Sequence, residues 1–245
     1  MATTLWQQRI QRAEKLAAQH PYAAEILGFY VHVARFQESL YLPKPELPAA
    51  FPQFLDLVAR HGPERVAQTA VTLRQAAEET WINLLNKVWS AAGPPSVPEE
   101  FLAFAYLQPF AEFSRDHARL HIEGYTGSIC LWCNRKPAAG ILRQQGDGGR
   151  RSLLCGFCLT EWEFRRVVCP GCGQEDHAKL PVYTAAEMPY IRVECCDTCQ
   201  TYIKSIDLTK NGLANPLVDE LASVPLNLWA QEHGYAKLHP NLLGM

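Results

Sequence analysis

Nine cysteines carry the most distinctive chemistry of this 245-residue chain, and they all lie between Cys130 and Cys199. Eight of them form Cys-x-x-Cys pairs, namely Cys130/Cys133, Cys155/Cys158, Cys169/Cys172 and Cys196/Cys199. Two thiolates three residues apart on a tight turn can bind one metal ion, and two such turns complete a tetrahedral site of four sulfurs. One pair alone is weak evidence, because redox motifs share this spacing. Four pairs in one short region predict metal binding.

The segments between the pairs indicate which pairs share an ion. Asn134 to Leu154 contains two extended runs around the turn sequence GDGG, which is typical of a β-hairpin that brings its flanking pairs together. Gly173 to Cys195 has a similar pattern. Leu159 to Val168 has no turn-forming residue and predicts a continuous strand, about 33 Å long at about 3.3 Å per residue. Its two ends are then too far apart to share an ion.

The sequence therefore predicts two separate four-cysteine sites, each occupied by zinc or iron. An interleaved arrangement stays open, although the hairpins favour sequential pairing. Each half repeats the order pair, hairpin, pair, strand, as expected of two rubredoxin-like or zinc-ribbon modules. Four thiolates close the coordination shell of the metal, so we expect no hydrolysis there. The first site contains Cys130, Cys133, Cys155 and Cys158, and the second contains Cys169, Cys172, Cys196 and Cys199.

Two further residues near the pairs could take part in metal or thiol chemistry. Cys196 keeps the spacing of the other pairs, so we expect its neighbour Cys195 to take no part, with a reactive thiol as the minor alternative. His177 could replace a ligand, but eight thiols already fill two sites.

Basic residues flank the cysteine pairs. A dication with four thiolates carries a net charge of −2, which neighbouring donors can offset. The candidates for this role, or for binding a partner, are Arg135, Lys136, Arg165 and Arg166. From Tyr125 to Lys210 there are eleven Lys or Arg against nine Asp or Glu. This small excess makes nucleic-acid binding the least favoured hypothesis, because binding the phosphate backbone needs several cations on one face.

The first half of the chain predicts helices that position no obvious chemistry. Apolar residues recur at helical spacing from Leu5 to Ala17, and further helices are expected over residues 21–40, 63–89 (one or two) and 98–118, the last with a kink at Pro109. Residues 42–52 form a proline-rich connection. We expect the aromatic residues to fill a core rather than a partner-binding groove. They include Trp81, Trp89, Phe101, Phe104 and Phe110.

After the second module, a C-terminal helix is expected to begin near Asn215, with Pro216 in its first turn. The final HPNLLGM is expected to be an extended tail. The inward-facing residues predicted for this helix are Leu217, Val218, Leu221, Leu226, Leu228 and Trp229.

Composition agrees with a globular chain, since 48% of residues are hydrophobic and the net charge is −2. The N-terminal segment has polar and charged residues where a signal peptide has its apolar core. No apolar run approaches the 18–20 residues or so of a membrane span. We therefore expect a cytoplasmic protein without a membrane span.

The cysteine segments resemble those of the formate dehydrogenase accessory protein FdhE family. The matching stretches are CLWCNRKPAAGIL, LLCGFCLTEWEFRRVVCPGCG, VECCDTCQTYIKSIDL and the tail DELASVPLNLWAQEHGYAKLHPNLLG. The resemblance is close from about residue 124 to the C-terminus, and the helical half agrees only in character. Asn134 and Gln200 depart from the family pattern, because each follows a pair where glycine is usual. Asn tolerates a positive φ best among non-glycine residues.

Residues and resemblance together predict an α+β fold. An all-helical N-terminal domain (1–120) precedes two tandem rubredoxin-like or zinc-ribbon modules (124–167 and 168–210), and a C-terminal helix and tail (211–245) follow. The resemblance implies a non-enzymatic maturation factor that binds the catalytic subunit of formate dehydrogenase, with no catalytic residue of its own. Rubredoxin-like electron transfer is the alternative function. The candidate partner-binding residues are Thr160, Glu161, Trp162, Arg165 and Arg166.

Overall fold

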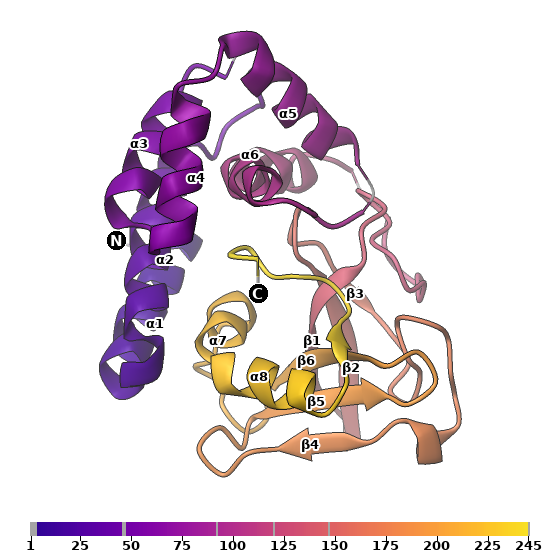
Figure 1. Ribbon diagram of the computed structural model, residues 1–245. Helices are drawn as coiled ribbons and strands as arrows, with labels where there is room; N and C mark the ends of the chain where they lie inside the picture. Colours follow the sequence, from indigo (N-terminus) through magenta and orange to yellow (C-terminus); the bar gives the residue numbers. More distant parts are fainter. Residues whose placement is uncertain (1–3, 46–47, 92, 120, 147, 245) are drawn as a thin grey trace. The chain divides into compact units, whose positions relative to one another are not determined.

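The computed structural model describes residues 4–45, 48–91, 93–119, 121–146 and 148–244. The chain forms two compact units. The first unit contains the described residues up to Arg119 together with Leu242–Gly244. The second unit contains the described residues that follow Arg119, as far as Asn241. The predicted order of a helical region, a sheet region with two four-cysteine clusters, and C-terminal helices is confirmed (Figure 1). The predicted boundary residue 120, the hairpin residue 147 and the last residue, 245, lie outside the described part.

The first unit is helical. Thr4 begins its first helix with a capping box, in which the side chains of Thr4 and Gln7 each accept a backbone N–H of the other residue. The segment 63–89 forms two helices, and the last helix of the unit continues through Pro109 as one element. The helices are α1 (Leu5–Gln19), α2 (Ala24–Ser39), α3 (Phe51–His61), α4 (Glu64–Arg74), α5 (Glu78–Ser90) and α6 (Pro98–Asp116), with a 3-10 turn η1 (Pro21–Ala23) before α2.

Helix α3 was not predicted, because the prolines around residue 48 suggested a longer connection. Its buried residues Phe51, Phe54, Leu55 and Val58 nevertheless lie at helical spacing. Phe51 and Phe54 contact the ring of Tyr106 at centroid distances of 4.9 and 5.9 Å. An aromatic core therefore holds α3 against α6, as expected for aromatic residues at helical spacing.

The aromatic residues that were predicted to fill the core of this unit differ in how far they are buried. Trp81, Phe104 and Phe110 are buried, whereas Trp89 and Phe101 are partly exposed. None of the described helices is long and apolar enough to cross a membrane.

The second unit is built on one seven-stranded sheet with the order β3-β2-β1-β6-β5-β4, and β7 pairs with β6. Both predicted hairpins form, because β1 pairs with β2 and β4 with β5 in antiparallel fashion. Parallel pairing of β1 with β6 then joins the two hairpins in a single sheet. The strands are β1 (Pro137–Gln145), β2 (Gly148–Cys155), β3 (Glu161–Glu163), β4 (Val182–Thr184), β5 (Ile191–Cys196), β6 (Thr201–Asp207) and β7 (Ala236–Lys237), and η2 (His177–Lys179) is a 3-10 turn.

The predicted continuous strand from Leu159 to Val168 is wrong. β3 covers only Glu161–Glu163, and the chain then turns. The reason is a side chain from β2: the Nη1 of Arg151 donates to the carbonyls of Arg165 and Val168, at 3.0 and 3.1 Å. These contacts hold the segment 164–168, called the linker below, as a loop instead of an extended strand.

The predicted single C-terminal helix is two helices, α7 (Pro216–Ala222) and α8 (Val224–Glu232). Helix α7 begins at the predicted place, with Pro216 in its first turn, and the side chain of Asn215 caps it by accepting from two backbone N–H groups of that turn. Pro225 in the first turn of α8 cannot continue a preceding helix, so the chain breaks at Ser223. Leu228 was wrongly placed inside: it is 55% exposed, whereas Leu226 is buried.

One face of the sheet packs against these C-terminal helices. Residues of β5 and β6, including Ile191, Val193 and Tyr202, form a core cluster with Leu226 and Ala230 of α8. Part of the predicted extended tail is buried, since His239 and Asn241 are 1% and 3% exposed, and β7 just before the tail pairs with β6. The core of the second unit therefore lies between the sheet and α7–α8 (Figure 1).

A buried ionic cluster joins α7 to this sheet. Glu220, 2% exposed, pairs with Lys204 of β6 at 2.9 Å and with Lys237 of β7, and accepts from Asn241 at 2.8 Å. Burial opposes ionisation of Glu220, but the two lysine charges outweigh it and lower its pKa to about 2. Complete burial lowers the pKa of Lys204 to about 7, because the attraction of Glu220 offsets only part of its desolvation.

We predict that Glu220→Gln destabilises the chain by about 3–5 kcal/mol, because it removes the carboxylate that pairs with the fully buried ammonium group of Lys204. The folded-state pKa of Glu220 lies below its ordinary value of 4.5. Its stabilising contribution is therefore complete above about pH 4.5 and decreases as the pH falls toward 2.

Urea unfolding of the wild type and Glu220→Gln between pH 2 and pH 7 measures both effects. The exposed Glu187→Gln is the matched control and should change the free energy of unfolding by less than about 0.5 kcal/mol. Equal stability of wild type and Glu220→Gln at pH 7 would contradict the prediction.

Candidate metal centres

Eight of the nine described cysteines form two groups of four, which match the predicted sequential pairing. Within each group the Sγ atoms lie within 4.8 Å of one another. Cys133 Sγ lies 3.4 Å from Cys155 Sγ and 3.6 Å from Cys158 Sγ in the first group. A tetrahedral ion with metal–sulfur bonds of about 2.3 Å needs sulfurs about 3.8 Å apart. Each group therefore fits a tetrahedral ion such as zinc or iron, and each could hold one.

The second group has the same dimensions. Cys169 Sγ lies 3.6 Å from Cys199 Sγ, and Cys172 Sγ lies 3.7 Å from Cys196 Sγ. Neither the distances nor the donor atoms distinguish zinc from iron, because both accept four thiolates in a tetrahedron.

The four Cys-x-x-Cys turns share one backbone conformation. In each turn the residue after the second cysteine has a positive φ, between 53° and 77°. Only one of these four positions is glycine. Asn134 and Gln200, which stand where glycine is usual in the family, adopt this conformation with φ of 57° and 53°. The other two are Leu159 and Gly173. The turn therefore imposes a positive φ even on non-glycine residues, which normally avoid it. Metal binding that holds the thiols in place would explain why this backbone strain is tolerated.

A second feature of the turns is a backbone hydrogen bond that closes them. The N–H of the first cysteine donates to the carbonyl two residues after the second cysteine, at 2.8 Å for Cys130 to Arg135 and 2.9 Å for Cys155 to Thr160. Cys169 donates to Gln174 in the same way, also at 2.9 Å. The internal repeat inferred from the cysteine spacing is therefore present in the backbone.

Hydrogen-bond donors surround the sulfur atoms. The amide N–H groups of Phe157 and Gly171 lie 3.4 and 3.3 Å from the first sulfur of their own turns. The hydroxyls of Thr160 and Thr201 lie 3.0 Å from Cys158 Sγ and Cys199 Sγ. Sequence analysis missed Thr201, although its position, two residues after the second cysteine of a pair, matches that of Thr160. Such donors orient metal ligands and partly neutralise the thiolates.

The two centres differ in their exposure to solvent. Cys130, Cys155 and Cys158 of the first centre are fully buried, whereas Cys172 of the second centre is exposed. The predicted neutralising cation Arg135 is also buried, and its guanidinium lies 3.9 Å from the centre of the Phe157 ring. The first centre is thus the more buried of the two, although Cys133 is half-buried, and the second exposes Cys172 to solvent.

The thiols of each centre cannot all be ionised unless a cation is bound. In the first centre, burial raises the pKa of Cys155 well above its ordinary value, while hydrogen bonding from Cys133 lowers the pKa of Cys130. In the second, burial raises the pKa of Cys169 to about 12. Burial also opposes ionisation of Cys199, but donors including Thr201 lower its pKa to about 7. A dication stabilises four thiolates together, so metal binding and release of thiol protons are coupled.

The residues predicted to bind a partner have different surroundings. Trp162 is 2% exposed and donates from Nε1 to the carbonyl of Gly127 at 2.8 Å, and Thr160 is 2% exposed beside Cys158. Glu161 is partly buried and pairs with Arg143. Arg165 and Arg166 are exposed. The accessible part of this set is therefore the linker, while Thr160 and Trp162 contact the interior of the module.

The remaining candidates lie outside the two groups of four sulfurs. Cys195 is buried on the sheet face that packs against α8, and burial raises the pKa of its thiol to about 12. His177 is exposed on η2. The eight ligand candidates therefore remain those predicted from their spacing.

The comparisons with known proteins agree with this architecture. The FdhE central domain matches residues 129–166, and the FdhE C-terminal domain matches residues 167–243. A protein named "Protein FdhE homolog" from Aquifex aeolicus is 32% identical over 202 residues, covering 82% of this chain and 71% of the relative. A relative of the same name from Pseudomonas aeruginosa is 28% identical over 98% of this chain and 89% of its own length.

A solved structure extends the similarity to the helical unit. The crystal structure of the FdhE protein from Pseudomonas aeruginosa covers 99% of this chain and 96% of its own, with a TM-score of 0.75 at 25% identity. The match therefore includes the helical region, for which the sequence resemblance was only general.

We predict that Thr160→Val weakens metal binding at the first centre by about 10- to 100-fold and leaves the second unchanged. Valine keeps the branched shape but removes the hydroxyl beside Cys158. Thr201→Val should have the reverse effect, so each variant is the matched control of the other. Titration of the metal-loaded protein with a chelator gives both affinities. Equal weakening of both centres by either variant, or no weakening, would contradict a local role for the hydroxyls.

Proposed function

Because the chain belongs to the FdhE family, we propose that it is a non-enzymatic maturation factor for formate dehydrogenase. It binds the immature catalytic subunit in the cytoplasm, before assembly or export of the enzyme. The main support is the agreement of the whole chain, helical unit included, with a solved FdhE structure. The two four-cysteine groups add support, because closed tetrathiolate sites suit a rigid binding scaffold better than hydrolysis.

We place the partner-binding surface of the second unit on the linker. Arg165, Arg166 and Val167 are consecutive exposed residues, and Val167 is 53% exposed. Arg151 fixes the backbone of this stretch at its first residue and just after its last, by donating to the carbonyls of Arg165 and Val168. A fixed loop that exposes two guanidinium groups and an apolar side chain suits a partner surface with carboxylates around an apolar spot.

We predict that the double variant Arg165→Glu, Val167→Glu, which reverses one charge and adds another, captures at least about tenfold less formate dehydrogenase catalytic subunit than the wild type. The exposed ion pair of Arg165 with Glu175 contributes little to stability, so the variant should fold normally. Tagged protein is used to capture partners from native cells grown without oxygen, and mass spectrometry quantifies the catalytic subunit. Arg60→Glu, on an exposed position of α3, is the control and should capture normally.

The same experiment tests the metal centres. Cys130→Ser or Cys169→Ser should each lose one of two metal ions and unfold one module, because ligand loss removes metal-coupled folding energy. Formate dehydrogenase activity in cells carrying only the variant should fall with capture. Normal metal content and enzyme activity in both variants would overturn the ligand assignment. Failure of the wild type to capture the catalytic subunit, even after cross-linking, would overturn the maturation role.

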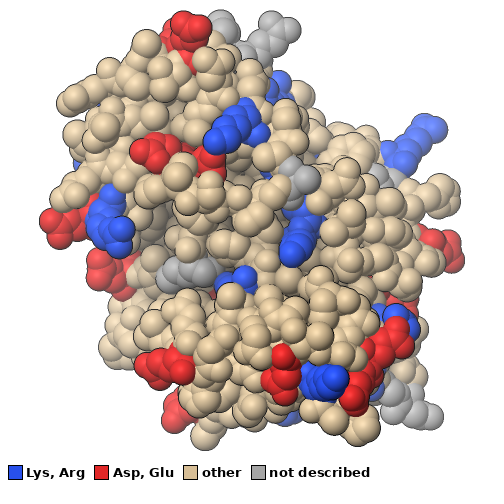
Figure 2. Space-filling view, turned by 45° about the vertical axis from the view of Figure 1, so that its right-hand side comes forward, with Lys and Arg blue, Asp and Glu red and all other residues tan. Residues whose placement is uncertain are grey.

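Electron transfer is the second candidate function, and the amide donors to Cys155 and Cys169 favour it. Hydrogen bonds to thiolate sulfur stabilise the extra negative charge on reduction and tune the potential of an iron centre. Nucleic-acid binding has less support, because the face shown in Figure 2 has basic and acidic side chains interspersed among uncharged ones.

Colour separates the electron-transfer hypothesis from a structural metal. Ferric thiolate absorbs visible light, whereas zinc thiolate does not. An electron carrier purified from iron-replete anaerobic cells should contain iron, absorb after oxidation and bleach reversibly on reduction. A colourless protein with two zinc ions would exclude this function.

A further inference from the structure

The sheet of the second unit has one face covered by helices and one that bears charged side chains. Successive residues of a strand point to opposite faces. On β5, Ile191, Val193 and Cys195 pack in the core against α8, so Arg192 and Glu194 point to the other face. Neither α7 nor α8 supplies a residue to the cavity on that face.

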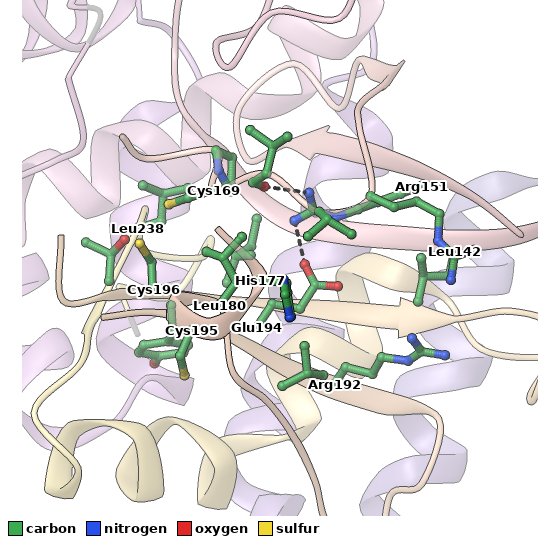
Figure 3. Close-up of a pocket in the computed structure, with 18 residues that line it drawn as sticks. Leu142, Arg151, Cys169, His177, Leu180, Arg192, Glu194, Cys195, Cys196 and Leu238 are labelled. Atoms are coloured by element: carbon green, nitrogen blue, oxygen red, sulfur yellow. Dashed lines mark hydrogen bonds and ion pairs between the residues drawn. The ribbon is translucent and has the colours of Figure 1, made fainter. Parts of the chain in front are cut away.

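A cavity of about 410 Å³ lies on this second face. Figure 3 shows Arg151 reaching Glu194 inside it, with Cys169 and Cys196 of the second metal centre at one side. Much of its wall is apolar, so a bound molecule would place hydrocarbon against most of the lining. The aliphatic lining residues include Leu142, Val168, Leu180, Val182, Ile203 and Leu238.

The charged lining has a positive excess. Among the described residues, Arg151, Arg166 and Arg192 line the cavity together with one carboxylate, that of Glu194. His177, which also lines it, adds no charge when neutral. Glu194 pairs with Arg151 and Asp207 pairs with Arg192, so these described side chains leave a formal charge of +1, which is that of Arg166. This guanidinium favours an anionic ligand at its own position in a largely apolar space, whereas a metal-loaded second centre carries −2 on the side of Cys169 and Cys196.

The three guanidinium groups differ in how far they are already paired. Arg151 binds Glu194 at 2.5 Å as well as the two linker carbonyls. Arg192 pairs with Asp207 at 2.7 Å and remains 30% exposed. Arg166 makes no hydrogen bond or ion pair within the described part of the chain. As far as the described residues show, the cavity therefore presents one guanidinium without a partner, that of Arg166, and a second, that of Arg192, which is paired but partly exposed.

We propose that this cavity binds a carboxylate carried on an apolar body, with Arg166 as its principal anion-binding residue and Arg192 assisting. One free guanidinium suits a single negative charge, which a carboxylate satisfies through two parallel hydrogen bonds. The aliphatic wall accommodates the hydrocarbon part of the ligand. The carboxylate can belong to a free aliphatic acid or to an acidic side chain between apolar residues of a polypeptide. The inference shares Arg166 and Val167 with the proposed partner-binding surface, but it does not require the maturation role.

The location gives the cavity a second property. Cys169 and Cys196 belong to both its wall and the second four-cysteine group, so a bound ligand lies directly beside that metal centre. The nearby Cys172 is exposed. Ligand binding should therefore perturb the surroundings of the second centre.

Methyl NMR of the metal-loaded full chain tests the proposal with hexanoate as the probe. Hexanoate should shift the methyl signals of Leu142, Leu180, Val182 and Leu238, with a dissociation constant on the order of 1–10 mM. The methyls of Leu213, which is 75% exposed, serve as an internal reference outside the cavity. Hexanamide has the same shape without the charge and should bind at least about tenfold more weakly.

Arg166→Gln should weaken hexanoate binding at least about tenfold, because it removes the uncommitted charge and keeps a side chain of similar length. Arg165→Gln, the neighbouring position outside the cavity wall, is the matched control and should bind normally. Equal binding of hexanoate and hexanamide, no binding of hexanoate, or unchanged binding by Arg166→Gln would each overturn the proposal.

Two peptides separate the sources of the carboxylate. Acetyl-Leu-Glu-Leu-amide binding more tightly than hexanoate, with acetyl-Leu-Gln-Leu-amide failing to bind, would support the carboxylate site and identify a polypeptide as its source. Binding of hexanoate but of neither peptide would support the same site and identify a free aliphatic acid. None of these measurements involves formate dehydrogenase, so their outcome leaves the maturation role to its own experiment.

Discussion

The buried guanidinium of Arg151 joins three segments of the second unit that are far apart in the sequence. From β2 it donates to two carbonyls of the linker, pairs with Glu194 on β5, and lies 5.3 Å from the centre of the Phe164 ring. The linker leads directly into Cys169, so the first ligand of the second centre is positioned by these contacts. Burying this cation is costly unless most of its donors are paired: Nη1 and Nη2 are paired through these contacts, while Nε has no hydrogen-bond partner among the described residues, so loss of this linker conformation would leave Nη1 unpaired as well.

The two metal centres show how one local structure acquires different surroundings. All four turns share a positive φ after the second cysteine, and donors to sulfur recur at equivalent positions. The parallel pairing of β1 with β6 nevertheless gives the two hairpins different neighbours. The first centre is buried beside Arg135, whereas the second borders a cavity and exposes Cys172. The two centres therefore have the same set of ligand candidates but differ in solvent exposure, because their surroundings differ.

The linker connects these properties to binding. Two of its carbonyls are fixed from inside by Arg151, while Arg165, Arg166 and Val167 are exposed, and Arg166 and Val167 also contribute to the cavity wall. Five residues therefore serve as a connection between two metal centres, as an exposed surface and as part of a binding cavity. A continuous strand could not do this, because its alternating side chains would point to only two faces and its carbonyls would be committed to a ladder.

The sequence by itself determined the eight ligand candidates, their division into two groups of four, both hairpins and the helical character of the first unit, because these features depend on residues close together in the chain. The division into two groups was correct although the strand invoked for it is short: each hairpin brings its own flanking pairs together. Only the tertiary structure decided the linker conformation, the pairing of β1 with β6, the burial of Thr160 and Trp162, and the ionic cluster around Glu220. These features depend on contacts between residues distant in the chain, and neither spacing nor periodicity records which distant groups will meet.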